Sequence, residues 1–198
     1  MIETMRWEKE KLLLLDQTKL PQSTEIIVCE DYKRVKIAIE RLEVRGAPAI
    51  GAAAAYAMVL GAKEAGNRPD FIGTLSKIKD DLISARPTAV NLSWAAEEVF
   101  SAAKSLYESD YAPFQIYGEL EMVADYIYQT DIMNNQRMGK FGAAVLPEKA
   151  VVLTHCNAGA LATCGWVQLS EYCVRLISRE SWKWCMLMKP DPCCRVQD

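Results

Sequence analysis

The sequence lacks any apolar run that approaches the roughly 20 residues of a membrane-spanning helix. Residues 1–6 also lack the basic-then-apolar order of a signal peptide. These absences predict a protein with no membrane partner, and we expect it in the cytoplasm. Excess charge is small as well, since the formal net charge is -3. That balance excludes an extended basic surface, so we expect no nucleic-acid partner, and any anionic ligand must be met by a local site.

Histidine and cysteine are scarce over most of the chain. The one histidine is His155, and Cys29 is the only cysteine among the first 155 residues. The other cysteines crowd the end of the chain, at 156, 164, 173, 185, 193 and 194. Their spacing matches no zinc-binding pattern. We therefore expect no metal and no cofactor.

What is present is the composition of a globular domain. The 198 residues are 51% hydrophobic and 25% charged, which excludes disorder and is enough to bury one sizeable core. Hydrophobic spacing predicts short strands at 5–7, 11–15 and 25–29, and helices at about 32–42, 49–65, 71–85, 90–107 and 113–137. Gly66 is placed to end the small and apolar helix 49–65, and turn signals at 139 and 142–147 follow the last helix.

A different pattern begins after those turns. The run 150–154 is short, β-branched and apolar, which is typical of a central parallel strand, and residues 155–159 follow it as a strand-to-helix turn. We therefore predict an α/β protein. A mainly helical N-terminal domain with a short β ribbon covers residues 1–145. The first strand and turn of a Rossmann-like parallel-sheet domain, incomplete here, cover residues 146–165.

The loop Arg45-Gly46-Ala47-Pro48 has the residues of a phosphate site. Gly46 permits a tight backbone and Pro48 suits a first helical turn, so the free N–H groups and the positive end of the helix dipole lie beside Arg45. Small residues that merely allow close helix packing, with a solvated arginine, explain the loop equally well.

A second arginine stands at a helix break. Pro87 disfavours helical geometry at Arg86, so the preceding helix should stop and present this arginine between two helices. Arg86 would then be a second cation for the same anion. A helix-terminal arginine that interacts only with its own helix dipole is the plainer alternative.

The turn Thr154-His155-Cys156-Asn157 follows the predicted parallel strand. Parallel sheets bind ligands beyond the carboxyl ends of their strands, so Cys156 lies where a reacting group should lie. Adjacent residues on an extended chain point apart, and a Cys–His pair therefore does not follow from the neighbouring His155. A buried, inert cysteine is the alternative.

Four segments, taken in order, resemble the S-methyl-5-thioribose-1-phosphate isomerases, which share a superfamily with the regulatory subunits of translation initiation factor 2B. They are LDQTKLP at 15–21, VRGAPAIG at 44–51, RPTAVNL at 86–92 and LTHCNAGALAT at 153–163. The resemblance covers residues 1 to about 165.

This resemblance implies an aldose–ketose isomerase of methionine salvage that converts S-methyl-5-thioribose 1-phosphate to S-methyl-5-thioribulose 1-phosphate. It implies that Arg45, Gly46 and Ala47 contact this sugar-phosphate substrate, that Arg86 holds it as well, and that Cys156 is the catalytic residue. Family members use an aspartate far downstream as a proton donor and form homodimers through their C-terminal domain, which leaves the oligomeric state of this chain open. The alternative within the superfamily is a regulatory or interaction protein without catalysis.

Residues 166–198 depart from this family. They hold three of the five tryptophans and lack the family motifs Gly-Thr-Ala-Leu-Gly and Ala-Asp-Glu-Thr-Arg-Pro. One permitted codon choice for residues 186–198, read from its third base, gives Ala-Asp-Glu-Thr-Arg-Pro, and a choice for 166–176 gives Gly-Thr-Ala-Leu-Gly in the same shifted frame. We therefore predict off-frame translation after a base lost near Gly165. The product would be an inactive, unstable or aggregating fragment. It would contain a single strand of the parallel sheet, with its edge unpaired.

Overall fold

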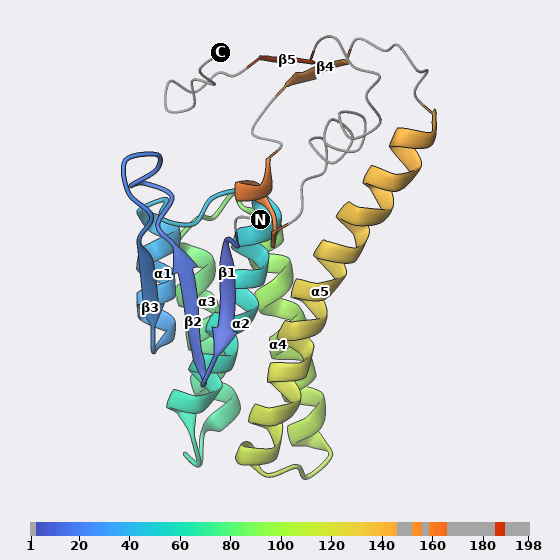
Figure 1. The fold of residues 1–198 in the computed structure, drawn as a ribbon. Helices are drawn as coiled ribbons and strands as arrows, with labels where there is room; N and C mark the ends of the chain where they lie inside the picture. Colours follow the sequence, from blue (N-terminus) through green and yellow to red (C-terminus); the bar gives the residue numbers. More distant parts are fainter. Residues whose placement is uncertain (1–2, 146–151, 156–158, 166–184, 189–198) are drawn as a thin grey trace.

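A computed structural model of the protein describes residues 3–145, 152–155, 159–165 and 185–188 (Figure 1). In these residues, five α-helices pack beside a three-stranded antiparallel sheet, and two further strands pair with each other. The strands are β1 (Met5–Glu8), β2 (Lys11–Leu15), β3 (Ile26–Cys29), β4 (Val152–His155) and β5 (Cys185–Met188); the helices are α1 (Tyr32–Glu40), α2 (Ala47–Ala65), α3 (Phe71–Ser84), α4 (Val90–Glu108), α5 (Pro113–Val145) and the short 3₁₀ turn η1 (Ala160–Ala162). The predicted fold class is confirmed.

The ribbon of β1, β2 and β3 forms because one face of its strands is apolar. β2 lies in the middle, with Leu14 opposite Met5 of β1 and Leu12 opposite Cys29 of β3. All four of these side chains are buried in the hydrophobic core. The sheet therefore covers one side of the helices, as Figure 1 shows.

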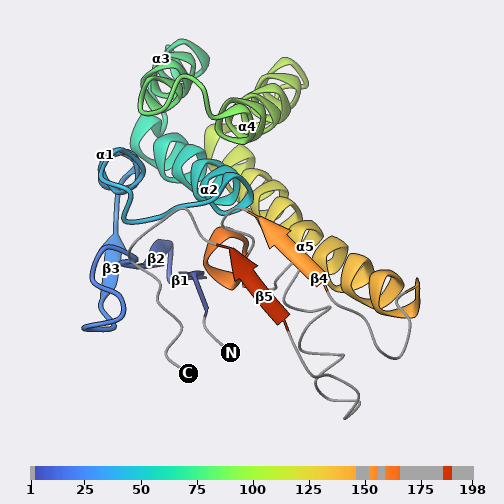
Figure 2. The same cartoon turned by 90° about the horizontal axis from the view of Figure 1, so that it is seen from above.

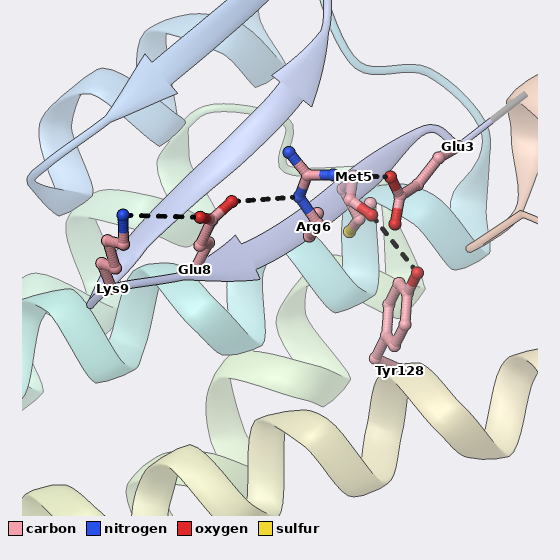
Figure 3. Close-up of polar contacts among 6 residues, drawn as sticks. All are labelled: Glu3, Met5, Arg6, Glu8, Lys9 and Tyr128. Carbon is pink, nitrogen blue, oxygen red and sulfur yellow. Dashed lines mark hydrogen bonds and ion pairs between the residues drawn. The ribbon is translucent and has the colours of Figure 1, made fainter.

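Polar groups of β1 face α5 and solvent (Figure 3). The Tyr128 hydroxyl of α5 donates a hydrogen bond to the carbonyl of Met5 at 3.2 Å. Arg6 forms ion pairs with Glu3 and Glu8 on the exposed side of the strand. Exposed pairs of this kind contribute little stability, so the contact with α5 and the apolar face hold β1 in place.

Helix α2 lies at the centre of the helical layer, with the other long helices around it (Figure 2). Its alanines, among them Ala53, Ala54 and Ala55, are fully buried because small side chains let neighbouring helices approach from several sides. Gly66, with φ of 54°, ends the helix in the left-handed region that glycine adopts readily. The predicted helix and its predicted end are both confirmed.

Helix α5 is longer than the sequence predicted. It continues through Gly139 and Gly142 to Val145, so the expectation that it ends near 137 is wrong. Glycine lowers helix stability by only about 1 kcal/mol relative to alanine and does not remove a backbone donor, so it weakens a long helix without ending it.

The prediction of a single parallel strand is also wrong. β4 pairs in parallel with β5, with Val152 opposite Cys185 and His155 opposite Met188. The unpaired backbone groups of an edge strand favour a partner, and the apolar run at 185–188 supplies one. Of the expected strand at 150–154, residues 152–154 lie in β4, and residues 150 and 151 lie outside the described residues.

Cys29 provides a pH test of the core. Its side chain is 0% exposed, and burial raises the pKa of its thiol from the ordinary value of 9.0 to about 12, against a lowering by Arg34. The folded state thus holds this proton more tightly than the unfolded state, so the stabilisation is complete below about pH 9 and is lost as the pH rises toward about 12.

We expect this group to lower the free energy of unfolding by about 1 kcal/mol between about pH 8 and pH 10. Urea unfolding of the wild type and of Cys29→Ala at both pH values measures the loss. The free energies of unfolding of the two proteins should differ less at the higher pH. Only the wild type has a thiol at this position, so only the wild type loses the stabilisation that comes from its raised pKa. A difference that stays constant with pH would contradict the assignment.

Candidate functional site

The N-terminus of α2 favours an anion. Gly46 is the residue that precedes the helix, with φ of 89°, Pro48 lies in the first turn, and no acidic side chain occupies that turn. The N–H groups of a first helical turn have no acceptor within the helix, and they add to the positive end of its dipole. Arg45 stands immediately before Gly46 and is half-buried. The predicted loop geometry is therefore present.

Gly46 is also in close contact with the segment that follows β4. A Cβ atom built on Gly46 would lie 2.3 Å from both the Cα and the carbonyl oxygen of Ala162. No side chain fits in that space, so the backbone of η1 touches the backbone of the loop before α2. This contact brings together the segments at 44–51 and 153–163, which are far apart in the sequence.

Three hydrogen bonds join the segment 159–165 to residues beside the β ribbon and to α5. They run from Thr4 Oγ1 to the carbonyl of Thr163, from Gln17 Nε2 to the carbonyl of Leu161, and from the Cys164 N–H to Asp131 Oδ2, each at 2.8 Å. Gln17 belongs to the segment 15–21. Three of the four segments singled out in the sequence thus meet around the start of α2.

The fourth segment, 86–92, joins them from the other side. Helix α3 ends at Ser84, as the Arg86-Pro87 pair predicted, and Arg86 is half-buried in the turn that leads to α4. A Cβ atom on Gly51 would lie 3.1 Å from the carbonyl oxygen of Asn91, so α2 and the start of α4 are in close contact. The structure therefore gathers both arginine-bearing segments at one end of the helical layer.

Cys156 lies outside the described residues, as do Asn157 and Ala158. The described chain resumes at Gly159 and continues into η1, beside Gly46. The role of Cys156 therefore stays a prediction.

A cavity opens between α2, α4 and α5 next to these segments. Its volume is about 380 Å³. Most of its exposed lining is apolar, as at Pro48, Trp94 and Ile127, and Asn91, Glu98, Thr130 and Asp131 add polar and acidic groups. We refer to it as the α2–α4–α5 cavity. Sequence reasoning missed Trp94 and Thr130. The one signal in the sequence was a tryptophan within a predicted amphipathic helix. In the structure Trp94 is half-exposed although it is large and apolar.

The Cys164 thiol, beside this site, is unreactive near neutral pH. Cys164 is buried, and both burial and the adjacent Asp131 carboxylate raise the pKa of its thiol far above the ordinary value. A thiol with a raised pKa stays protonated near neutral pH and is a poor nucleophile. Cys164 therefore serves the structure, with its N–H bound to Asp131.

No group of three or more His, Cys, Asp or Glu side chains is placed to hold a metal ion within residues 3–145 and the shorter described segments. In the same part of the chain, no helix has the length and apolar character needed to cross a membrane.

Comparisons with known proteins agree with this geometry. Residues 43–181 match the initiation factor 2 subunit family. The methylthioribose-1-phosphate isomerase of Desulforamulus reducens is 48% identical over 166 residues, an alignment that covers 81% of this chain and 46% of that protein. The chain thus spans about half the length of the curated relatives it matches.

Two solved structures share the fold. The 5-methylthioribose 1-phosphate isomerase from Pyrococcus horikoshii OT3 superposes with a TM-score of 0.83 at 32% identity, covering 93% of this chain and 52% of that chain. The translation initiation factor eIF-2B subunit delta from A. fulgidus superposes with a TM-score of 0.76 at 34% identity, covering 96% of this chain and 54% of that chain. One fold therefore carries both an isomerase and a subunit of a translation factor.

Proposed function

The chain belongs to the initiation factor 2 subunit family, and from that premise we propose that it is the N-terminal part of an aldose–ketose isomerase. The reaction is the conversion of S-methyl-5-thioribose 1-phosphate to S-methyl-5-thioribulose 1-phosphate, a step of methionine salvage. The observation that carries the proposal is the convergence of both arginine-bearing segments with the segment after β4 at the start of α2. The isomerase name of a relative at 48% identity supports it over a regulatory role.

We assign the phosphate to the start of α2. The first-turn N–H groups and the dipole of α2 attract the dianion, and Gly46 and Ala47 provide the backbone that approaches it. Arg45 and Arg86 stand at the same end of the helical layer and supply two positive charges. An arginine forms strong, charge-assisted hydrogen bonds with phosphate oxygens, so the two together fix one end of the substrate.

The phosphate determines how the sugar ring opens. It is bonded to the anomeric oxygen, so the ring cannot simply open to a free aldehyde. In the proposed reaction the bond between C1 and the ring oxygen breaks, and the ring oxygen takes a proton. The hydrogen on C2 moves to C1, and the C2 hydroxyl loses a proton to become the ketone. A positioned acid must supply the first proton, and exclusion of water protects the opened sugar. We assign Cys156 to this reacting centre.

The phosphate assignment predicts that Arg45→Ala and Arg86→Ala each weaken binding of S-methyl-5-thioribose 1-phosphate by roughly tenfold or more, because each removes a charged hydrogen-bond donor. Titration calorimetry of the 198-residue chain measures the dissociation constants, with inorganic phosphate as a competitor. Arg68→Ala is the matched control, because Arg68 is an exposed arginine beyond the opposite end of α2. If all three variants bind equally well, the assignment is wrong.

The family also includes regulatory subunits, and a chain of that kind without catalysis is the alternative. The same titration separates the two functions. Binding of the sugar phosphate that depends on Arg45 supports the isomerase, whereas a folded chain that binds no sugar phosphate supports the regulatory protein.

We further propose three domains: 1–145, 146–165, and an off-frame tail at 166–198. The resulting fragment would show no turnover of the substrate. We propose a cytoplasmic homodimer for the complete enzyme, and the oligomeric state of this chain stays open. The family match extends to residue 181, which is beyond the proposed loss of a base near Gly165. Resequencing of the coding DNA across codons 160–200 therefore tests whether the tail is off-frame. A base that restores Gly-Thr-Ala-Leu-Gly after Gly165 supports the off-frame tail, and a relative with the same in-frame tail overturns it.

A further inference from the structure

We propose that Gln17 is a positioning residue of the sugar-phosphate site, which holds the segment 159–165 in place against the loop that begins α2. The inference rests on the proposed function, because the phosphate is assigned to that loop. The segment 15–21, which contains Gln17, supplies none of the proposed phosphate contacts. Gln17 acts instead through the two backbone segments that it joins.

Gln17 binds two segments that are far apart in the sequence. Its backbone N–H donates a hydrogen bond to the carbonyl of Glu43 at 2.9 Å, and Glu43 lies two residues before Arg45. Its side-chain Nε2 donates a hydrogen bond to the carbonyl of Leu161 at 2.8 Å, in η1. One residue thus joins the loop before α2 to the segment that follows β4.

The Glu43 end of this link is fixed by α1. The N–H of Glu43 donates to the carbonyl of Ala38 at 2.9 Å, and Arg34 Nη1 lies 2.7 Å from Glu43 Oε2. The Glu43 side chain is 10% exposed, so this charge-assisted hydrogen bond is little weakened by water. Glu43 is therefore a fixed point from which the loop with Arg45 begins.

The turn around Gln17 is fixed by the preceding residue. Asp16 is buried, and its Oδ1 accepts hydrogen bonds from the N–H of Thr18 at 2.9 Å and from the Thr18 hydroxyl at 2.6 Å. An aspartate that binds the backbone two residues ahead stabilises a turn of this kind. The Gln17 side chain therefore leaves the turn in a defined direction, toward Leu161.

The Leu161 end of the link lies beside the closest contact between the two segments. Ala162 follows Leu161, and a Cβ atom built on Gly46 would lie 2.3 Å from the Cα of Ala162. Such a contact stops the segments from coming closer but does not stop them from separating. A hydrogen bond is directional and resists separation. Gln17 therefore fixes the spacing between the phosphate loop and the segment that the sugar must also meet.

The test compares the binding of S-methyl-5-thioribose 1-phosphate and of inorganic phosphate to the whole 198-residue chain by titration calorimetry. Gln17→Met removes the amide, nearly preserves the side-chain length and leaves the backbone bond to Glu43 in place. The affinity for the sugar phosphate should fall about tenfold, because the segment beside the sugar is no longer held. The affinity for inorganic phosphate, which needs only the start of α2, should change by no more than about twofold.

Gln17→Asn is a second variant with the same expected result. It keeps the amide but shortens the side chain by one methylene group, so the amide no longer reaches the carbonyl of Leu161. Circular dichroism of both variants shows that they are folded, and unchanged binding of inorganic phosphate shows that the start of α2 is intact.

Thr4→Val is the matched control, because it removes one hydrogen bond of the same length to the same segment. Thr4 Oγ1 donates to the carbonyl of Thr163 at 2.8 Å, and within the described residues no hydrogen bond joins Thr4 to residues 43–46. We expect the sugar phosphate to bind this variant no more than about threefold more weakly than the wild type.

A loss that is confined to the sugar phosphate in both Gln17 variants, with little change in Thr4→Val, supports the inference. Full affinity for the sugar phosphate in the Gln17 variants, or an equal loss in Thr4→Val, overturns the inference and leaves the phosphate site standing. A wild type that binds neither ligand overturns the proposed function as well.

Discussion

Gly46→Ala is expected to release the segment 159–165 from the helical layer. The new methyl group would lie 2.3 Å from the backbone of Ala162, and the φ of 89° at this position is one that alanine rarely adopts. Backbone strain of this kind costs of order 1–3 kcal/mol, and the overlap with backbone atoms adds to it because no flexible side chain can move away. We expect docking of the segment to weaken by about 3 kcal/mol, which is roughly a hundredfold in the equilibrium.

Hydrogen exchange of the Cys164 amide measures this loss, because that N–H is bound to Asp131 only while the segment is docked. Gly66→Ala is the control. Gly66 also has a positive φ, of 54°, but the nearest atom to its added Cβ would be the Lys63 carbonyl oxygen at 3.6 Å. The control should therefore lose only the strain energy, with Cys164 still protected. Equal protection of Cys164 in both variants would show that contact with Ala162 does not hold the segment.

Phe71→Ala is expected to lower the free energy of unfolding by about 3–5 kcal/mol, the usual cost of a large cavity in a packed core. The Phe71 ring is 0% exposed, and its centroid lies 6.1 Å from that of Tyr107, so it joins the start of α3 to the end of α4. The stability of a domain of this size is 5–15 kcal/mol, and the variant should lose a large part of it.

Urea unfolding followed by circular dichroism measures the change, with Phe114→Ala as the control. Phe114 lies at the start of α5 and is 71% exposed, so its removal should change the stability by no more than about 0.5 kcal/mol. Equal, small losses in the two variants would mean that the helical layer does not unfold as one cooperative unit. The large loss predicted for Phe71 would show that packing between α3 and α4 contributes strongly to the stability of the chain.

The helical part could be predicted because its signals are local. The run from Ala49 to Ala65 is small and apolar at nearly every position, which fits only a helix surrounded by neighbours, and Gly66 marks its end. Gly139 misled the prediction for α5, because a glycine weakens a helix without showing whether the surrounding packing sustains it. The pairing of β5 with β4 joins residues that are far apart in the sequence, and no local pattern specifies such a partner.

The candidate site could be predicted only in part. Arg45 was found because the glycine after it permits a tight turn, and Arg86 because the proline after it disfavours helical geometry. That their segments meet depends on the contact between Gly51 and Asn91, which arises from the packing of α2 against α4. Trp94 and Thr130 line the cavity for the same reason, and their place in it appears only when helices distant in sequence are brought together.

The most direct test of one shared site is a map of backbone amide shifts by nuclear magnetic resonance as S-methyl-5-thioribose 1-phosphate is added. We expect the largest shifts at Gly46 and Ala47, at the start of α2, and at Arg86, in the turn before α4. Ribose 1-phosphate carries the same phosphate and should reproduce the shifts at Gly46, Ala47 and Arg86. Shifts that avoid the start of α2, or their absence at saturating ligand, would contradict a sugar-phosphate site formed by these segments.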